Sequence, residues 1–235
     1  MKRQKFIILV CLFFASLKSN GQTISDLSMK ICDSIKSHNY TKSDTIALKQ
    51  VEIYSYFIGI YYLNNNQRQI KNWQSDLNSV NYKLTRELNK TCESFKIKNS
   101  FILPFSNLVE IDSIFSEQQS KRINEIAKDI RIKSQMEIVI LSIDELYPSE
   151  NILDFSITKL DDWNIGGVLE KSGLIIVFSQ KLRLLRISTT EIAKRYLSNI
   201  ECEKIVSDIM IPNFKNGNYY EGIVNSLYKI KELTK

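Results

Sequence analysis

The chain has 235 residues, and 32 Lys and Arg against 26 Asp and Glu give a formal net charge of +6 at pH 7. Four of these basic residues and no acid lie in the first 21 positions, so the charge of the remaining chain falls from +6 by 4 to +2. A nearly balanced chain that lacks a basic stripe interleaved with aromatic residues excludes nucleic acid as the expected partner.

Residues 1–21 have the three-part layout of a secretory signal peptide. A basic start precedes an apolar run from Phe6 to Ala15, and small or polar residues follow up to Gly21. A membrane-spanning helix needs about 20 apolar residues, and this run has about half that number. We therefore expect cleavage near Gly21, export to the periplasm or the extracellular space, and no transmembrane segment in the mature chain. A retained membrane anchor is the alternative.

Residues 22–98 are predicted to form a helical N-terminal region of two or three helices. The region contains no Pro and a single Gly, Gly59, and its apolar residues recur at helical spacing. Ser43 or Asp44 is placed to cap the second helix, and the run of Asn after Leu63 is expected to end it.

Three cysteines follow the signal segment. Cys32 and Cys92 lie at opposite ends of the helical region, and an exported protein meets an oxidising compartment in which disulfides persist. We predict a bridge between these two residues. The alternative is three separate thiols, with Cys202 as a small core residue. None of the three has the close paired spacing of a zinc site.

Residues 99–104 are interpreted as a linker, because the helical pattern ends there and Pro104 favours an extended or turning chain. Helical and strand patterns then alternate through residues 105–235. The predicted elements are a helix at 116–134, a strand at 136–143, a helix at 149–163, strands at 173–179 and 183–188, and helices from about 190 and 219. Strands separated by helices of this length indicate a layered α/β domain.

Two runs predict how the sheet is arranged. The run EIVILSI, residues 137–143, is almost continuously apolar, which is typical of a central strand covered on both faces. The run IIVFSQKLRLLRI, residues 175–187, favours a hairpin that turns near Gln180 and Lys181. The second strand of this hairpin does not alternate cleanly, so an edge position is expected for it.

Three stretches of the second half occur in a recognisable order: DDWNIGG at 161–167, SGLIIVFS with its partner RLLRI at 172–187, and IPNFKNGNYYEGI at 211–223. Together they resemble the TPM domain, a family named after plant thylakoid-lumen and photosystem II repair proteins and a nematode receptor modulator. The resemblance covers about residues 105–230. Its motif and turn positions are Trp163, Gly166, Gly173, Pro212, Phe214, Gly217, Tyr219, Tyr220, Gly222 and Ile223.

Local chemistry suggests a structural role for these positions. Trp163 is expected to pack its helix against the sheet, with the floor of a pocket as the alternative. Gly217 is expected to take a positive φ in a turn between two helices. Asn218, where the family often has Asp, is expected to cap the following helix or to adopt the left-handed conformation.

The resemblance implies a mixed β-sheet flanked by helices, usually in a secreted or membrane-tethered protein. Some members of the family are described as weak acid phosphatases. Others bind calcium or act as assembly and repair factors without clear chemistry. A fold does not determine which reaction a protein catalyses, so function has to be inferred from the site residues.

The sequence departs from the family pattern after the second strand of the hairpin. The family usually has two Gly residues, a Glu and then an Asp before the next helix. By spacing, Thr190 and Ile192 take the Gly positions here, Lys194 takes the Glu and Asn199 takes the Asp. The Gly-lined acidic loop of the family is thus replaced by residues that predict the start of an ordinary helix.

Four acids are candidate metal ligands. At the domain entrance the family often has an Asp, for which this chain offers Glu110 by spacing or Asp112 after a slip of two. Asp161 and Asp162 form a pair at a helix end. Calcium takes six to eight oxygen ligands, and these acids are hypothesised to converge at a strand-end crevice, where α/β sheets bind ligands. Solvated surface acids are the alternative.

The residue patterns expected of a catalytic site are missing from the predicted α/β domain. The predicted α/β domain contains no His and no Gly-rich phosphate loop, and Ser179 has no positioned base. We therefore predict a non-catalytic interaction or assembly and repair module that binds an unknown envelope or secreted protein, with no catalytic residues and no certain cofactor. The second hypothesis is a calcium-binding, weak phosphatase-like hydrolase that uses the acidic crevice.

Overall fold

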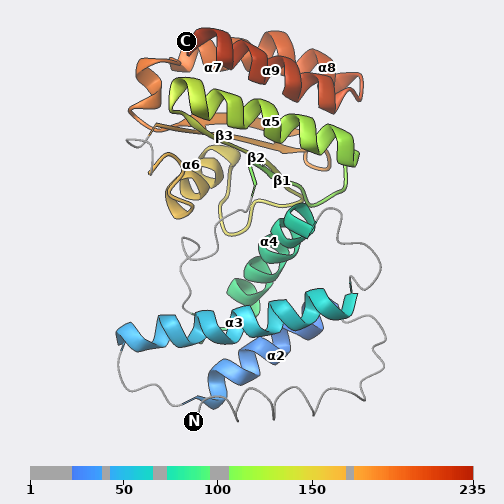
Figure 1. The fold of residues 1–235 in the computed structure, drawn as a ribbon, viewed down its shortest axis with the longest axis vertical. Coiled ribbons are helices and arrows are strands. Elements are labelled where there is room, and N and C mark those ends of the chain that lie inside the picture. Colours follow the sequence, from blue (N-terminus) through green and yellow to red (C-terminus); the bar gives the residue numbers. More distant parts are fainter. Residues whose placement is uncertain (1–22, 39–42, 66–72, 96–105, 168–171, 235) are drawn as a thin grey trace.

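The computed structural model describes residues 23–38, 43–65, 73–95, 106–167 and 172–234. The predicted signal segment and the predicted linker at 99–104 lie outside these residues. Figure 1 shows two helices at one end of the molecule, an α/β domain at the other, and a third helix running between them. These three N-terminal helices are α2 (Ile24–Ser37), α3 (Ser43–Asn65) and α4 (Trp73–Thr91).

The prediction of two or three N-terminal helices is confirmed. Helix α2 begins at a capping box in which the Thr23 side chain accepts from the N–H of Asp26 and the Asp26 side chain accepts from the N–H of Thr23. Its apolar residues Leu27, Ile31 and Ile35 recur every four positions and are fully buried against α3 and α4. The helices therefore share one small core.

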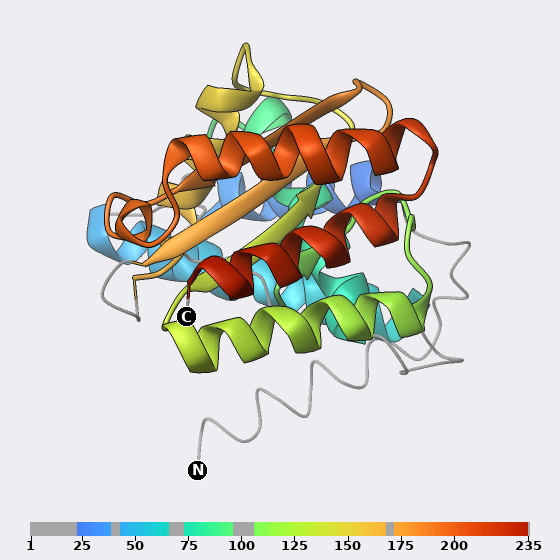
Figure 2. The same ribbon diagram turned by 90° about the horizontal axis from the view of Figure 1, so that it is seen from above.

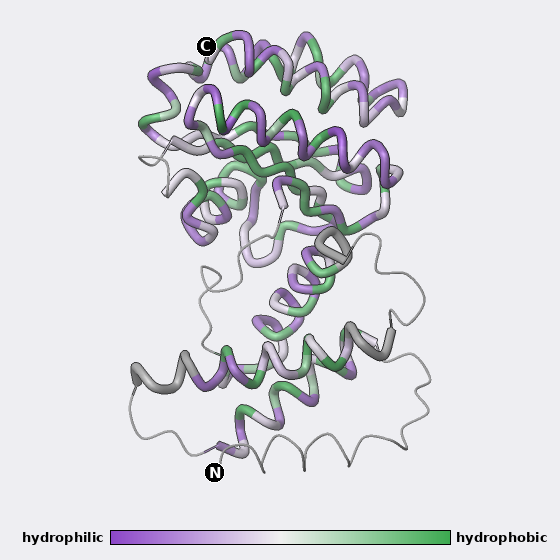
Figure 3. The backbone as a smooth tube through the Cα atoms, in the orientation of Figure 1, coloured by the Kyte–Doolittle hydropathy of each residue, from purple (hydrophilic) through white to green (hydrophobic). Residues whose placement is uncertain are grey.

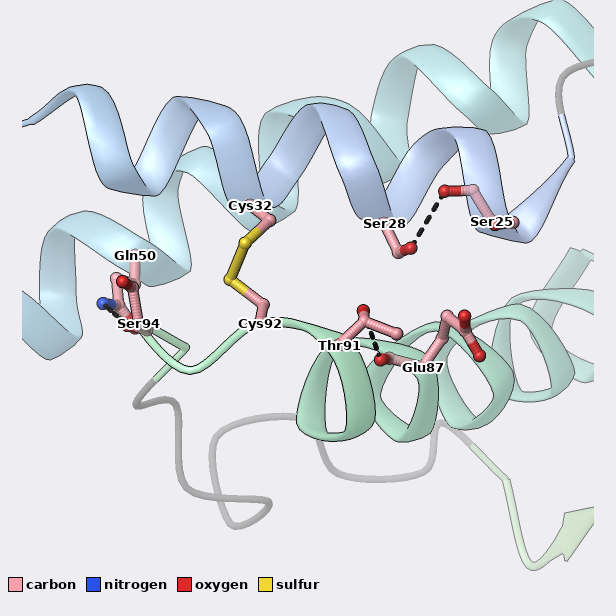
Figure 4. The surroundings of a disulfide bond; sticks show 8 residues. All are labelled: Ser25, Ser28, Cys32, Gln50, Glu87, Thr91, Cys92 and Ser94. Atoms are coloured by element: carbon pink, nitrogen blue, oxygen red, sulfur yellow. Dashed lines mark hydrogen bonds between the residues drawn. A yellow bond between two sulfur atoms is a disulfide. The ribbon is translucent and has the colours of Figure 1, made fainter.

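The predicted disulfide is present. Cys32 in the middle of α2 is bonded to Cys92, which directly follows the last residue of α4, with the two Cα atoms 5.7 Å apart. Figure 4 shows the bridge between the two helices and, beside it, Gln50 of α3 next to Ser94. The Gln50 side-chain amide donates to the Ser94 carbonyl at 2.9 Å. One covalent bond and one partly buried hydrogen bond thus tie the three helices together.

The α/β domain contains a mixed four-stranded sheet in the order β1-β2-β3-β4. Its strands are β1 (Leu108–Val109), β2 (Glu137–Ser142), β3 (Gly173–Ser179) and β4 (Leu184–Thr189). Strands β1, β2 and β3 are parallel, and β3 pairs antiparallel with β4. The predicted central strand, the hairpin and the edge position of its second strand are all confirmed.

Helices cover both faces of the sheet. The helices concerned are α5 (Glu117–Ser134), α6 (Ile152–Asp162), α7 (Asn199–Lys204), α8 (Ile211–Lys215) and α9 (Tyr219–Leu233). Figure 2 shows α5, α9 and the α7 to α8 segment side by side across one face. The other face packs against α6 and receives Tyr82 from α4. In Figure 3 the most hydrophobic backbone lies in the strands between these layers.

One predicted helix begins at a different place. The sequence favours a helix from Thr190, but only a short 3₁₀ turn, η2 (Ala193–Arg195), follows β4, and α7 begins at Asn199. The Thr190 hydroxyl accepts from the N–H of Gly173 at 2.9 Å, which holds this segment to β3. Ser198 then provides the capping box that starts α7. The helix continues to Lys215 through a π-helical segment, η3 (Ile205–Met210).

Candidate functional site

The candidate calcium ligands occupy two separate places. Glu110 and Asp112 follow β1 at the carboxyl end of the parallel strands. Asp161 and Asp162 end α6, and the chain just after them donates a backbone N–H to Glu137, the first residue of β2, at 2.6 Å. The two acid pairs therefore lie toward opposite ends of the sheet. Within the described part of the chain, no group of three or more His, Cys, Asp or Glu is arranged to hold a metal.

Glu110 is turned into the protein. Its side chain is buried, with 7% of the residue exposed, and its carboxylate accepts from the N–H of Phe115 at 2.7 Å. Burial raises the pKa of Glu110, while hydrogen bonds from the backbone N–H groups of Phe115 and Ile114 oppose this rise. The carboxylate thus closes the loop between β1 and α5.

Asp112 instead lines a shallow crevice of about 490 Å³ at the carboxyl end of the sheet. The crevice lies between the loop after β1, the β3–β4 turn and the start of α9. Its lining residues are Asp112, Ser113, Ile114, Gln119, Gln180, Gly217, Asn218, Tyr219, Tyr220 and Glu221. Two carboxylates, from Asp112 and Glu221, and several amide and hydroxyl oxygens therefore face one opening. We call it the strand-end crevice.

The turn at the start of α9 is only partly as expected. Gly217 has φ +76°, which confirms the predicted positive φ. Asn218 is the N-cap residue of α9, as one alternative expected, although its side chain makes no capping hydrogen bond; its φ of −86° rules out the left-handed alternative. The chain turns at Gly217, so Asn218 does not need the left-handed conformation.

The motif residues around this turn pack against one another. The rings of Phe214 and Tyr219 lie 4.6 Å apart, and both contact the ring of Phe178 in β3. Gly222 faces Phe214 so closely that an added Cβ would lie 2.6 Å from the ring. These residues dock α8 and α9 onto the sheet, which is the structural role that their chemistry indicates.

The same holds for the Gly residues between α6 and β3. Gly166 has φ +84°, and a Cβ on Gly173 would overlap the backbone carbonyl of Ile165. Trp163 is buried on the adjacent face, where its ring meets that of Tyr82 edge to face at 6.4 Å. Packing, the expected role of Trp163, is confirmed, although the residue also lines a cavity.

That cavity, of about 360 Å³, lies where α4 meets α6, and we call it the α4–α6 cleft. Its lining residues are Asn78, Asn81, Tyr82, Thr85, Arg86, Asn89, Val109, Tyr147, Pro148, Thr158, Lys159, Asp162 and Trp163. Residues 78–89 come from the N-terminal helical region, and the others come from the α/β domain. The cleft is therefore formed jointly by the two parts of the chain.

Lys159 is the most unusual residue of the cleft. Its side chain is only 12% exposed, and its Nζ lies 3.8 Å from Oδ2 of Asp162, beyond hydrogen-bond distance. The ammonium also lies 5.7 Å from the ring centre of Phe155 and 5.9 Å from that of Trp163. Burial lowers the pKa of Lys159, and the charge of Asp162 opposes this in part. Within the described part of the chain, the ion pair with Asp162 is therefore the one polar contact given for Nζ.

Arg86 is bound by acids of the loop after β2. Its guanidinium pairs with Asp144 and, at 3.2 Å, with Glu145, which also pairs with Lys90. Burial raises the pKa of Asp144, but the hydrogen bond and charge of Arg86 outweigh this and lower it. The ion pairs hold α4 against the α/β domain and form one rim of the cleft.

This cleft was not predicted from the sequence. Phe155, Lys159 and Trp163 are spaced by four residues, so they lie on one face of α6. A Lys between two large aromatic residues on an apolar face is a signal that the sequence does carry. No comparable signal exists for Arg86 or Asn81, because their positions depend on how α4 docks.

The reactive side chains of the α/β domain have structural roles. The hydroxyl of Ser179 accepts from the N–H of Leu182 at 3.0 Å and so belongs to the hairpin turn. Cys202 is buried and unbridged, as expected, and burial raises the pKa of its thiol to about 11. No helix in the described ranges is long and apolar enough to cross a membrane.

Comparison with known proteins assigns the second half of the chain. A family model described as the TPM domain matches residues 109–233. No curated protein matches the chain. The N-terminal domain of a protein from P. gingivalis, solved by solution NMR, is similar, with 22% sequence identity and a TM-score of 0.50 over 57% of this chain and 86% of that one. The BA42 protein from the psychrophilic bacterium Bizionia argentinensis shows 15% identity and a TM-score of 0.47 over 53% and 84%.

Proposed function

Because this chain belongs to the TPM domain family, we propose that it is an exported, non-catalytic binding module of the cell envelope whose recognition site is the α4–α6 cleft. The observation that carries the proposal is the composition of the cleft. One wall is α4, which lies outside the matched residues 109–233, and the other belongs to the TPM domain. A ligand in this cleft would contact both the N-terminal helical region and the TPM domain.

Export is supported by two independent features. The first 21 residues have the layout of a signal peptide, and the bridge between Cys32 and Cys92 is of a kind that persists in oxidising compartments. A binding role in the periplasm or outside the cell is consistent with both.

A role without catalysis is supported by the state of the reactive groups. The hydroxyl of Ser179 belongs to a turn, the carboxylate of Glu110 closes a loop, and burial keeps the thiol of Cys202 protonated at neutral pH. Activated nucleophiles need an adjacent base or a lowered pKa instead.

Site-specific photo-crosslinking in the native host tests the proposal. Tyr147 lines the cleft and is 41% exposed, and Tyr196 does not line it and is 54% exposed, so they form a matched pair. Replacing each in turn by p-benzoylphenylalanine is expected to give a discrete adduct at position 147 that disappears in a Lys159→Met background, and none at 196. Equal labelling at both positions would remove the cleft as the recognition site.

A hydrolysis assay tests the absence of catalysis. The mature chain is expected to cleave a generic phosphomonoester, p-nitrophenyl phosphate, no faster than an Asp112→Ala variant or the blank, with and without calcium. A rate above the blank that falls in Asp112→Ala would show that the module is an enzyme.

Calcium binding in the strand-end crevice is the second candidate function, and with it weak phosphatase activity. The carboxylates of Asp112 and Glu221 and nearby amide oxygens supply the hard ligands that calcium prefers. Calorimetric titration after chelation would show binding that is lost in Asp112→Asn and kept in Asp162→Asn. The absence of heat in the wild type would eliminate this candidate.

A further inference from the structure

The α4–α6 cleft contains a largely buried cation that no hydrogen bond within the described residues satisfies. The side chain of Lys159 is 12% exposed, and Oδ2 of Asp162, its ion-pair partner, lies 3.8 Å from its Nζ. A charged group that loses water without gaining a partner costs free energy. An anionic oxygen that enters the cleft would recover part of this cost.

A second donor comes from the opposite wall. Asn81 of α4 is buried, and its Oδ1 accepts from the hydroxyl of Tyr54 at 3.1 Å. This bond sets the orientation of the side-chain amide, and its Nδ2 amide NH2 group is left without a partner in the described part of the protein. The two walls of the cleft therefore offer two donors to an acceptor between them, the ammonium of Lys159 and the amide NH2 of Asn81.

The charges around the cleft limit what this acceptor is. Arg86 is already paired with Asp144 and Glu145, and Asp162 lies 3.8 Å from Lys159. One incompletely paired cation beside a carboxylate suits a single negative charge better than the two of a phosphate monoester, which Asp162 would repel. A carboxylate carries one charge and accepts from both donors.

The rest of the lining is mixed: Asn78, Thr85, Asn89 and Thr158 are polar, and four other residues form an apolar part. Val109, Pro148, Tyr82 and Trp163 border the cleft, and its volume of about 360 Å³ is within the range of small-molecule sites. Resting on the proposed function of the cleft, we propose that it recognises a carboxylate carried by an apolar body, through Lys159 and Asn81. The source is either a small organic acid or the free C-terminus of a peptide that ends in an apolar residue.

Three small probes test the chemistry. 3-Phenylpropionate has the carboxylate and an apolar body, 3-phenylpropionamide has the same body without charge, and phenyl phosphate has a second charge. Binding is followed by NMR through the indole N–H of Trp163 in the mature chain. We expect the acid to bind at least about tenfold more tightly than the amide, the typical value of a charged hydrogen bond, and more tightly than the phosphate. Equal affinity for acid and amide, or a preference for the phosphate, would overturn the inference.

Variants assign the two donors. Lys159→Met keeps approximately the length of the side chain without its charge. Asn81→Asp keeps the acceptor for the Tyr54 hydroxyl but loses the amide NH2 donor. Both are expected to weaken binding of the acid by about tenfold or more. Lys128→Met is the matched control, because Lys128 is an exposed Lys on α5 outside the cleft. Unchanged affinity in Lys159→Met, with a melting curve that shows a folded protein, would contradict the assignment.

Peptides separate the two sources. A tetrapeptide ending in Phe with a free C-terminus and its C-terminally amidated form are compared with 3-phenylpropionate. Tighter binding of the free peptide assigns the site to a chain terminus, and tighter binding of the acid assigns it to a small molecule. If position 147 gives a crosslinked adduct but the acid binds no more tightly than the amide, only the proposed carboxylate chemistry of the ligand is overturned. Loss of both the adduct and the binding would overturn the proposed function as well.

Discussion

The bridge between Cys32 and Cys92 is expected to contribute a large part of the stability of the N-terminal helices. It joins residues that are 60 positions apart in the sequence. In the chain-entropy treatment, opening a loop of that length destabilises the folded state by roughly 4 kcal/mol, because the unfolded chain gains conformations. Both side chains are buried in the core shared by α2, α3 and α4, so the effect is expected to be local to that core.

Urea unfolding of the mature chain measures this contribution. Oxidised wild type, reduced wild type and the Cys32→Ala/Cys92→Ala double variant are compared by far-UV circular dichroism. Reduction removes the covalent link without changing side-chain volume, whereas the double variant also loses packing. Cys202→Ala removes one buried thiol from the other core and is expected to cost only about 1 kcal/mol.

A loss below about 1 kcal/mol in the reduced protein would contradict the entropy argument, since the link would then not restrict the unfolded chain. If only the Cys32→Ala/Cys92→Ala variant is destabilised, and by no more than Cys202→Ala, its loss comes from packing alone. Retention of the binding of 3-phenylpropionate after reduction would show that α4 remains docked without the bridge.

Two further predictions concern single residues. Gly173→Ala is expected to destabilise the protein by roughly 3 kcal/mol, because the new Cβ overlaps backbone that cannot move cheaply, whereas Gly59→Ala, with open space around it inside a helix, is expected to be neutral or stabilising in the same urea assay. Lys159→Met is expected to stabilise the protein at pH 7, because burial lowers the pKa of the folded-state ammonium. Since the unfolded chain then binds more protons, wild-type stability rises with pH through the folded-state pKa, and the advantage of Lys159→Met shrinks between pH 7 and pH 10. A constant difference across that pH range would show that the ammonium is not the cause.

The elements that local chemistry specifies were predictable from the sequence. Helix α5 begins one residue after Ser116, where Ser116 and Gln119 form a capping box, and it ends at Ser134 as the apolar pattern indicates. The apolar run of β2 and the expected turn near Gln180 and Lys181 likewise predicted the core strand and the hairpin. In each case the residues that determine the element lie within a few positions of it.

Other elements depend on distant contacts and were not predictable. Strand β1 has only two residues, and it is a strand because Leu108 and Val109 pair with β2. The hydroxyl of Thr190 accepts from the N–H groups of Gly173 and Ala193, so it starts only the short turn η2, and α7 begins nine residues after Thr190 at its own cap, Ser198. Such bonds join parts of the chain that no local pattern relates.

The bridge between Cys32 and Cys92, the layered α/β class and the acids worth testing were all predicted from the sequence, because cysteine count, strand length and residue type carry this information. The packing of distant segments, in contrast, makes Glu110 close a loop and places Asp112 and Asp162 in different openings. It alone also placed α4 against α6 and so formed the cleft. Arg86 and Asp144 are 58 positions apart, and their contact exists only once the hydrophobic surfaces of both regions have packed.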